Sequence, residues 1–418
     1  MSRWSLLALL GLMIASSPSV QADDWPQWRG PNRDGISKET GLLPQWPESG
    51  PQLQWRVENA GSGYSTPAVV GDRMYLLGNE GNDNEFVLAL STGDGSEIWR
   101  TRIGSVGHPD QRPPYPGARS TPTVDGNHVC VLGSNGDLAC LDASSGEIHW
   151  TLNVREQFGG QYGEWAYSES PLVDGDQVIV APGGSEATVV ALNRENGDVI
   201  WKTALEEADN AAYASAVISE AGGVKQYVHF LSKGLIGLEA ETGKLLWRFD
   251  KVAEGSPANI PTPIVSGDYV YGGSNRGGAA LLKLNRNGES FEVEEVYASS
   301  RLPTGIGGAV LVGDHLYGST GQGLVCVDFK TGEIVWQDRS IGASAICVAE
   351  GNLYLHGDDG DVALVEVNPE KYVEQGRFSL PEQPDRGRSK AWEYPVVANG
   401  HLYLRDLNVV WSYDIAGK

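Results

Sequence analysis

Apolar and polar positions alternate in short runs along most of the chain after residue 50, and glycine-containing turns separate the runs. A typical unit is an apolar run, a Gly-polar turn and a second apolar run, as in "TVDGNHVCVLG" (123–133), followed by a third alternating run, "NGDLACLDA" (135–143). Alternation with a period of two predicts β-strands, and such short turns join them into hairpins. We find no stretch with the periodicity of a convincing helix. The pattern therefore predicts an all-β fold.

A fourth element closes most units with a turn glycine and a tryptophan. It occurs as "TGDGSEIW" (92–99), "SGEIHW" (145–150), "NGDVIW" (196–201), "TGKLLW" (242–247) and "TGEIVW" (331–336). Successive tryptophans are 51, 51, 46 and 89 residues apart. The 89-residue gap is about two periods long and contains a degenerate copy of the element that ends at Tyr297. A period near 50 with four strands per unit predicts the blades of a β-propeller.

Hairpins that begin near residues 68, 123, 172, 216, 264, 309, 346 and 396 give eight units, the last with only three strands. The segment "LQWRV" (53–57) carries Trp55, which is in phase with the repeat and can supply the missing outer strand. Closure of this kind removes open sheet edges. We therefore predict one domain over 51–418, an eight-bladed β-propeller of four-stranded antiparallel blades whose ring is closed by an N-terminal strand.

The N-terminus predicts export. Arg3, the apolar run at 6–15 and the small-residue end "VQA" at 20–22 are typical of a secretory signal peptide, assigned to 1–22. Residues 23–50 then form an N-terminal extension. No cysteine near the junction offers a lipid anchor, and no later stretch is long enough for a membrane span. We expect a soluble mature protein in the periplasm or outside the cell.

The net charge limits the classes of partner, and the cysteine content limits the possible disulfides. The formal net charge is -23 without any run of Lys or Arg, so nucleic acid and anionic membranes are poor candidates. The four cysteines do not make a disulfide framework. Cys130 and Cys140 lie opposite each other only if their hairpin loop has three residues, and are otherwise two buried apolar side chains. Whether Cys326 and Cys347 meet is left open.

The phrases above, with "ALSTGDGSEIW" (89–99) and "CVDFKTGEIVW" (326–336), resemble the quinoprotein-type repeat of the PQQ-binding-like β-propeller proteins. The opening "WPQWRGPNRDGIS" (25–37) is similar to the N-terminal extension of a bacterial group in that family. The resemblance covers nearly all of the mature chain.

The resemblance implies two alternative functions. Pyrroloquinoline quinone (PQQ) dehydrogenases hold their cofactor in the central funnel on a tryptophan, beside a vicinal disulfide and a calcium ion with acidic and amide ligands; this chain has no Cys-Cys pair. The lipoprotein propeller of the outer-membrane β-barrel assembly machine binds partners and does no chemistry; this chain lacks its lipidated cysteine.

Catalytic and metal motifs are weak. His128, His315 and His401 occupy the same turn position of three blades, which favours a structural role. The acidic stretches 78–86 and 356–362 contain calcium-type ligands, but 356–362 aligns with an ordinary hairpin and 78–86 is a slightly better candidate. We name no catalytic residue and expect neither a metal nor a cofactor; PQQ and calcium belong only to the dehydrogenase alternative.

The segments that enter the innermost strands are less repetitive than the blades, and packing does not explain that difference. Their large side chains are candidates for one central ligand site, although small residues at a crowded axis and aromatic packing between loops explain them too. The candidates are Arg119, Glu164, Trp165, Tyr167, Glu169, Tyr213, Asn259, Trp392 and Glu393.

The repeated aromatic residues receive a structural role instead, docking one blade onto the next. They are Trp55, Trp99, Trp150, Trp201, Trp247 and Trp336. We expect a non-catalytic propeller of the cell envelope that binds an unidentified protein or small ligand. The alternatives are a PQQ-dependent alcohol or sugar dehydrogenase and an extracellular carbohydrate-binding or lyase propeller.

Overall fold

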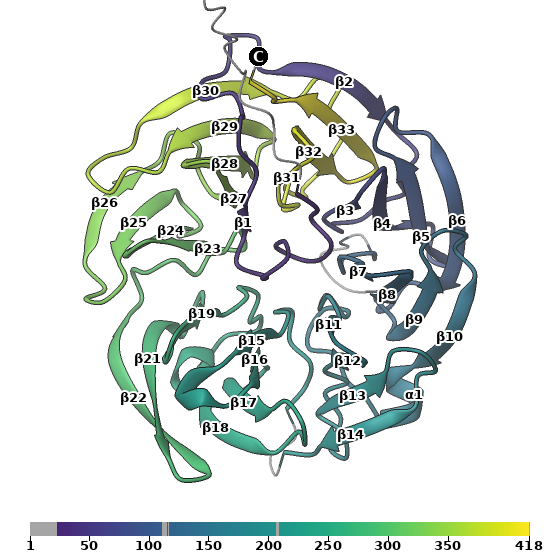
Figure 1. Ribbon diagram of the computed structural model, residues 1–418, viewed down its shortest axis with the longest axis vertical. Coiled ribbons are helices and arrows are strands. Elements are labelled where there is room, and N and C mark those ends of the chain that lie inside the picture. Colours follow the sequence, from purple (N-terminus) through teal and green to yellow (C-terminus); the bar gives the residue numbers. More distant parts are fainter. Residues whose placement is uncertain (1–22, 111–114, 116, 206–208, 418) are drawn as a thin grey trace, which may run out of the picture.

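The described part of the chain forms a ring of eight β-sheets around a central axis (Figure 1). The computed structural model describes residues 23–417 except 111–114, 116 and 206–208, so the predicted signal peptide, 1–22, lies outside the described residues. Each sheet contains a four-stranded antiparallel blade that runs outward from the axis, and the predicted eight-bladed propeller is confirmed. No helix among the described residues is long and apolar enough to cross a membrane.

The strands of blades 1 to 4 follow one another along the chain. Their bounds are β3 (Ala68–Val70), β4 (Arg73–Glu80), β5 (Asn84–Ser91) and β6 (Glu97–Gly104); β7 (Thr123–Asp125), β8 (His128–Leu132), β9 (Asp137–Asp142) and β10 (Ile148–Asn153); β11 (Leu172–Asp174), β12 (Gln177–Val180), β13 (Val189–Asn193) and β14 (Val199–Thr203); and β15 (Val217–Ser219), β16 (Gln226–Phe230), β17 (Leu235–Glu239) and β18 (Leu245–Phe249).

Blades 5 to 8 continue the ring. Their bounds are β19 (Ile264–Ser266), β20 (Tyr269–Ser274), β21 (Gly278–Asn287) and β22 (Ser290–Ser299); β23 (Ala309–Val312), β24 (His315–Ser319), β25 (Leu324–Asp328) and β26 (Ile334–Asp338); β27 (Ser344–Ala349), β28 (Asn352–Gly357), β29 (Asp361–Glu366) and β30 (Glu374–Ser379); and β31 (Val396–Ala398), β32 (His401–Asp406) and β33 (Val409–Asp414). Short helical turns are α1 (Val154–Phe158), η1 (Ala221–Gly223) and η2 (Lys251–Ala253).

The N-terminal strand closes the ring as the sequence predicts. Strand β2 (Gln52–Val57) pairs antiparallel with β33, so the last blade takes its outer strand from the beginning of the propeller. The indole of Trp55 on β2 then donates to the Thr92 carbonyl of blade 1 at 2.8 Å. Both ends of the ring are thereby joined by main-chain pairing and by an aromatic contact.

At most junctions, an aromatic side chain of one blade packs against the next blade in the same way. The indole N–H of Trp150 donates to the Arg194 carbonyl of blade 3 at 2.7 Å, and a Cβ at Gly197 would lie 2.8 Å from the Trp150 ring. Glycine therefore lets the ring of one blade lie directly on the turn of the next, and its φ of +76° suits that turn. The same arrangement recurs for Trp55, Trp99 and Trp201, and Tyr297 repeats it with its hydroxyl, which donates to the Phe329 carbonyl.

Trp247 departs from this arrangement. Its indole donates to Gln226 Oε1 within its own blade, and no described atom lies within 4 Å of a Cβ placed at Gly288 in the next blade. The reason is the length of the β21–β22 hairpin, whose ten-residue strands carry the turn beyond the reach of Trp247. Trp336 keeps the hydrogen bond, to the Asn368 carbonyl at 2.9 Å.

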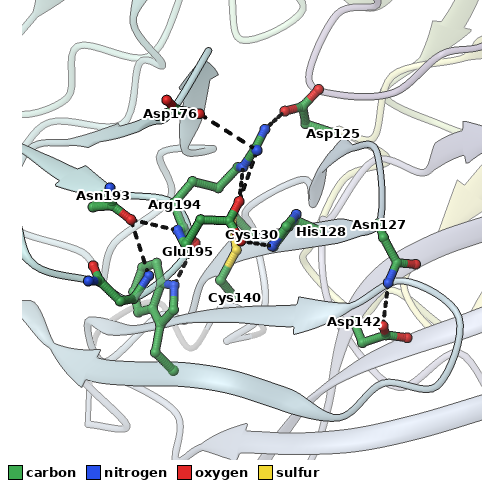
Figure 2. Close-up of polar contacts among 12 residues, drawn as sticks. Asp125, Asn127, His128, Cys130, Cys140, Asp142, Asp176, Asn193, Arg194 and Glu195 are labelled. Atoms are coloured by element: carbon green, nitrogen blue, oxygen red, sulfur yellow. Dashed lines mark hydrogen bonds and ion pairs between the residues drawn. A yellow bond between two sulfur atoms is a disulfide. The ribbon is translucent and has the colours of Figure 1, made fainter.

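Polar contacts add to the junction of blades 2 and 3, as Figure 2 shows. Arg194 pairs with Asp125, and His128 Nε2 lies 3.2 Å from Glu195 Oε2. Exposed ion pairs of this kind contribute at most about 1 kcal/mol each, whereas burial of an aromatic ring contributes about 1.5–3 kcal/mol. The tryptophan therefore carries most of the stabilisation at this junction.

Blade 2 also contains a disulfide between Cys130 and Cys140 (Figure 2). The two residues are directly paired across β8 and β9 because the loop consists of Ser134, Asn135 and Gly136, the three-residue length that this pairing requires. Cys326 and Cys347 are buried free thiols. Burial raises the pKa of Cys326 to about 11, so its thiol is protonated at neutral pH.

The N-terminal extension crosses the middle of the ring (Figure 1). It bonds to the inner edges of three blades: Trp25 pairs with Val69, the Pro26 carbonyl accepts from Val124 N, and β1 (Ile36–Ser37) pairs in parallel with β27. Innermost strands expose unpaired main-chain groups toward the axis, and an extended segment satisfies them. The extension therefore covers one end of the central channel.

Two arginines fix the extension at the axis. Arg33 is 3% exposed, and its guanidinium donates to the carbonyls of Ser170, Pro171 and Ala216 at the entries of blades 3 and 4. Arg29 donates to the Ala309 carbonyl of blade 6 at 2.5 Å. Both residues adopt positive φ, near +60°, a strained conformation for arginine that these contacts maintain.

Candidate functional site

A central cavity of about 330 Å³ lies at the axis above the extension, at the end where the chain enters the innermost strands. Its wall is mainly aromatic. It is lined by Trp28, Tyr64, Tyr115, Arg119, Trp165, Ser168, Tyr213, Ser215, Ala258, Ile260, Ile306, Trp392 and Tyr394. We refer to it below as the central cavity.

One position of the repeat builds most of the wall. In six blades the residue four positions before the first residue of the innermost strand lines the cavity, as Tyr64 does before Ala68. In blade 6, Val310 pairs with Tyr317 as Ala68 pairs with Tyr75, and Ile306 stands four residues before it. These wall residues are Tyr64, Arg119, Ser168, Tyr213, Ile260, Ile306 and Trp392. The position is the same in seven blades, but its residue types are diverse.

The rings contact one another around the wall. Ring centroids of Trp392 and Tyr115 are 5.3 Å apart, as are those of Trp392 and Tyr64, and Trp165 lies 5.9 Å from Tyr213. Such distances are typical of stabilising aromatic pairs. The Tyr213 hydroxyl also accepts a hydrogen bond from the Trp165 main-chain N–H at 2.8 Å. The wall is therefore held in place by its own contacts.

The extension supplies the floor. The Trp28 indole donates to Thr262 Oγ1 at 2.8 Å, and its ring meets that of Tyr394 edge to face at 4.7 Å. Tyr394 in turn donates to the Ile306 carbonyl. Trp28 belongs to the segment anchored by Arg29 and Arg33, so the same segment that covers the channel also shapes the cavity.

Four of the nine candidates from the sequence line this cavity: Arg119, Trp165, Tyr213 and Trp392. The other five do not. Glu164 is exposed next to Trp165, while Tyr167, Glu169, Asn259 and Glu393 are buried inside the blades. The reason is alternation: successive side chains of an extended segment point to opposite sides. The position four before the strand faces the cavity, and the positions three and five before it, which these four residues occupy, face away.

Each of the four buried residues has a structural partner. Tyr167 donates to the Pro182 carbonyl at 2.7 Å, and Asn259 donates to the Leu231 carbonyl at 2.7 Å. A carboxyl oxygen of Glu169 accepts from the main-chain N–H of Ala181, and one of Glu393 accepts from that of Leu407. Their position within the blades indicates that they pack between strands and form hydrogen bonds with main-chain groups.

A group of buried ionisable side chains lies beneath the cavity. Glu169 Oε1 is 3.5 Å from His229 Nε2, which also lies 3.2 Å from the Ala214 carbonyl. Burial raises the pKa of Glu169 to about 8 and lowers that of His229 to about 4. Burial also lowers the pKa of Arg33 to about 9; Glu169 opposes this shift only when it is ionised. Near neutral pH the glutamic acid is thus largely protonated and the histidine neutral.

Sequence reasoning missed several wall residues, including Trp28, Tyr64, Ile260 and Ile306. Tyr64 and Ile260 could have been found by counting four residues back from each innermost strand, and Ile306 by the same count from Val310, the residue of blade 6 equivalent to Ala68. Trp28 gave no such signal, because it lies outside the repeat and reaches the axis only through the path of the extension.

The donor set does not suit a calcium-bound quinone. The described residues lining the cavity include one arginine but no carboxylate and no side-chain amide, and Asn259 is turned toward Leu231. Over the described parts of 23–417, no group of three or more His, Cys, Asp or Glu side chains is placed to hold a metal ion. The acids of 78–86 and 356–362 form no such group; Asp358, whose pKa burial raises to about 6, is hydrogen-bonded to Trp392.

A family model described as outer membrane protein assembly factor BamB matches residues 83–338. The chain belongs to this family. It is 25% identical over 245 residues to the BamB of Moranella endobia, a match that covers 56% of this chain and 55% of that protein. The chain thus spans about half the length of that relative.

Two solved structures share the fold. BamB from Moraxella catarrhalis has a TM-score of 0.58 and 17% identity, over 87% of this chain and 97% of that one. A europium-containing methanol dehydrogenase has a TM-score of 0.69 and 13% identity, over 91% and 89%. An assembly factor and a dehydrogenase are therefore both built on this architecture, and the residues of the cavity must distinguish between their functions.

Proposed function

We propose that this protein is a non-catalytic binding propeller of the cell envelope, which holds a partner at the mouth of the central cavity. The observation that carries the proposal is the wall itself: one repeat position holds a different residue type in most blades, whereas the docking position holds tryptophan or tyrosine at most junctions. A folding role alone needs no such variety at equivalent positions. Membership of the BamB family supports a partner-binding role.

The chemistry of the wall supports binding over catalysis. Among the described lining residues, aromatic and aliphatic groups provide contact area and Arg119 provides a positive charge. A general acid–base reaction needs a positioned pair of titratable groups at the substrate, and the buried Glu169 and His229 lie inside the blades, beneath the wall. Export to the envelope is part of the proposal and rests on the N-terminal signal.

Site-specific crosslinking in the exporting cell tests the proposal. A photoreactive amino acid replaces Ile306 in the cavity wall, and a matched variant carries it at Asp72, which is exposed in the turn between β3 and β4. We expect a discrete crosslinked product from position 306 that is missing from position 72. Equal products from both positions, or none from 306, contradict the proposal.

The dehydrogenase alternative has its own test, because the solved neighbours include a dehydrogenase. Purified protein is incubated with PQQ and Ca²⁺, and a bound chromophore and alcohol-dependent dye reduction are measured. Stoichiometric binding with turnover would replace our proposal by that alternative.

A further inference from the structure

The central cavity continues into a second hollow over blades 5 and 6. This side groove, of about 400 Å³, is lined by Trp165, Ser256, Pro257, Ala258, Ile260, Pro261, Asn275, Arg276, Thr304 and Ile306. Four of these residues, Trp165, Ala258, Ile260 and Ile306, also line the cavity. A deep aromatic hollow and a more polar groove thus share one boundary.

The charge of this joined surface is opposite to that of the protein. The chain has a formal net charge of -23, yet no Asp or Glu occurs among the described residues that line either hollow. The cavity contains Arg119, whose guanidinium donates to the Ala166 carbonyl at 3.2 Å, and the groove contains the exposed Arg276. A cationic lining inside an acidic molecule favours an anionic ligand and guides its approach.

Hydrogen-bonding groups lie in the cavity, where Ser168, Ser215 and the Tyr64 hydroxyl line the wall, and also along the boundary and the groove. The indole Nε1 of Trp165 is buried without a hydrogen-bond partner in the described structure. A buried donor of this kind is costly unless a ligand accepts from it. Asn275 adds an exposed amide in the groove. These groups suit a main chain, whose carbonyls and N–H groups recur at intervals.

A sugar fits this surface less well than a peptide does. A sugar carries hydroxyls on most of its carbons, and each hydroxyl buried against an apolar wall without a partner costs free energy. A peptide can place an apolar side chain in the cavity and keep its polar main chain in the groove.

We propose that the central cavity and the side groove together bind an extended acidic peptide segment of a protein partner. One aromatic or large aliphatic side chain enters the cavity, and carboxylates next to it in the sequence face Arg119 and Arg276. This inference rests on the proposed function and names the class of partner.

The test uses a random heptapeptide library displayed on phage, selected on the intact exported protein. Enriched sequences are synthesised with a fluorescent label, and their dissociation constants are measured by anisotropy. We expect a consensus that combines Phe, Trp, Tyr or Leu with neighbouring Asp or Glu. For such peptides Arg276→Glu weakens binding by about tenfold or more, because a favourable charge contact becomes a repulsive one.

Matched variants make the outcome decisive. Arg339→Glu introduces the same charge change at another exposed arginine that lines neither hollow, and leaves affinity unchanged. Trp392→Ala weakens binding through the cavity wall. Arg276 is exposed, so its variant keeps the fold, which circular dichroism verifies. Absence of an enriched consensus, a consensus rich in Lys or Arg, or equal effects of Arg276→Glu and Arg339→Glu overturns the inference.

The crosslinking experiment separates this inference from the proposed function. A crosslinked partner at position 306 together with a failed peptide selection means that the partner is of another class, and only the peptide inference is wrong. Failure of both experiments rejects the binding function as well.

Discussion

The outer ring of docking aromatics and the central cavity both use tryptophan and tyrosine, but in opposite ways. In the outer ring the same residue meets the same partner at one junction after another, as Trp99 and Trp150 each meet a turn glycine and a carbonyl of the following blade. In the cavity, equivalent positions hold Tyr64, Arg119 and Ile260. A repeated contact indicates packing, and variation at a geometrically equivalent position indicates recognition.

The largest effect should come from the outer ring. Trp150→Ala removes a buried ring from the junction of blades 2 and 3, and we expect it to lower the free energy of unfolding by about 3–5 kcal/mol. Denaturant unfolding measures the change. The control is Arg194→Ala, which removes the ion pairs but keeps the carbonyl that accepts from Trp150, and should cost about 1 kcal/mol or less. Equal losses would show that the ion pairs, and not the ring, dock the blades.

The glycine under that ring gives the next effect. Gly197→Ala places a methyl group 2.8 Å from the Trp150 ring and imposes positive φ on alanine. We expect a loss of about 2–4 kcal/mol, from the left-handed backbone and the displaced ring together. Gly175→Ala, with φ of +59° and open space around its Cβ, isolates the backbone part at about 1–2 kcal/mol. Similar losses in both variants would mean that contact with the ring is unimportant.

The centre, unlike the outer ring, should respond to pH. The folded-state pKa of Glu169 is raised to about 8, so the folded protein binds a proton that the unfolded chain releases above about pH 4.5. Stability from this group is present at low pH and is lost as pH rises through 8, by about 1.4 kcal/mol per unit. His229 is neutral in the folded protein over this range and titrates in the unfolded chain near pH 6.5, in the parent and in the variant alike. Comparison of the two proteins between pH 5.5 and 7.5 therefore isolates Glu169, and Glu169→Gln should flatten the decline by that amount.

The control for this titration is Glu195→Gln at the exposed junction of blades 2 and 3. The pKa of Glu195 is lowered by Arg194, so its carboxylate is ionised throughout the window and its loss leaves the slope unchanged. Unfolding measured at several pH values distinguishes the two variants, and an unaltered slope in Glu169→Gln would contradict the assignment.

The smallest effect on stability should come from the cavity wall. Trp392 is partly exposed to the cavity, so Trp392→Ala should cost about 1 kcal/mol. The same variant is expected to weaken peptide binding, whereas Trp150→Ala, at temperatures where it stays folded, leaves binding unchanged. A loss of stability as large as that of Trp150→Ala would show that Trp392 has mainly a structural role, and would contradict the distinction between the two regions.

Prediction from the sequence succeeded where contacts are local and repeated. The hairpins, the eight blades and the closing strand at Trp55 follow from alternation and turn glycines. Prediction was weaker at the centre, where Glu169 and Glu393 were grouped with Arg119 and Trp392. The segments that enter the innermost strands do line the cavity. In an extended chain, however, neighbouring side chains point in opposite directions, so a residue one position away from a wall residue points into a blade. The sequence of these segments has no periodic pattern that shows which positions face the cavity.

The sequence by itself determined the strand pattern, the number of blades, the way the ring closes and the docking residues, because each depends on spacing along the chain. Only the tertiary structure decided that Trp28 forms the floor of the cavity, that Arg29 and Arg33 hold the extension at the axis, and that Trp247 bonds within its own blade. Those contacts join residues hundreds of positions apart or depend on the length of a neighbouring hairpin, and they exist only once the ring has closed.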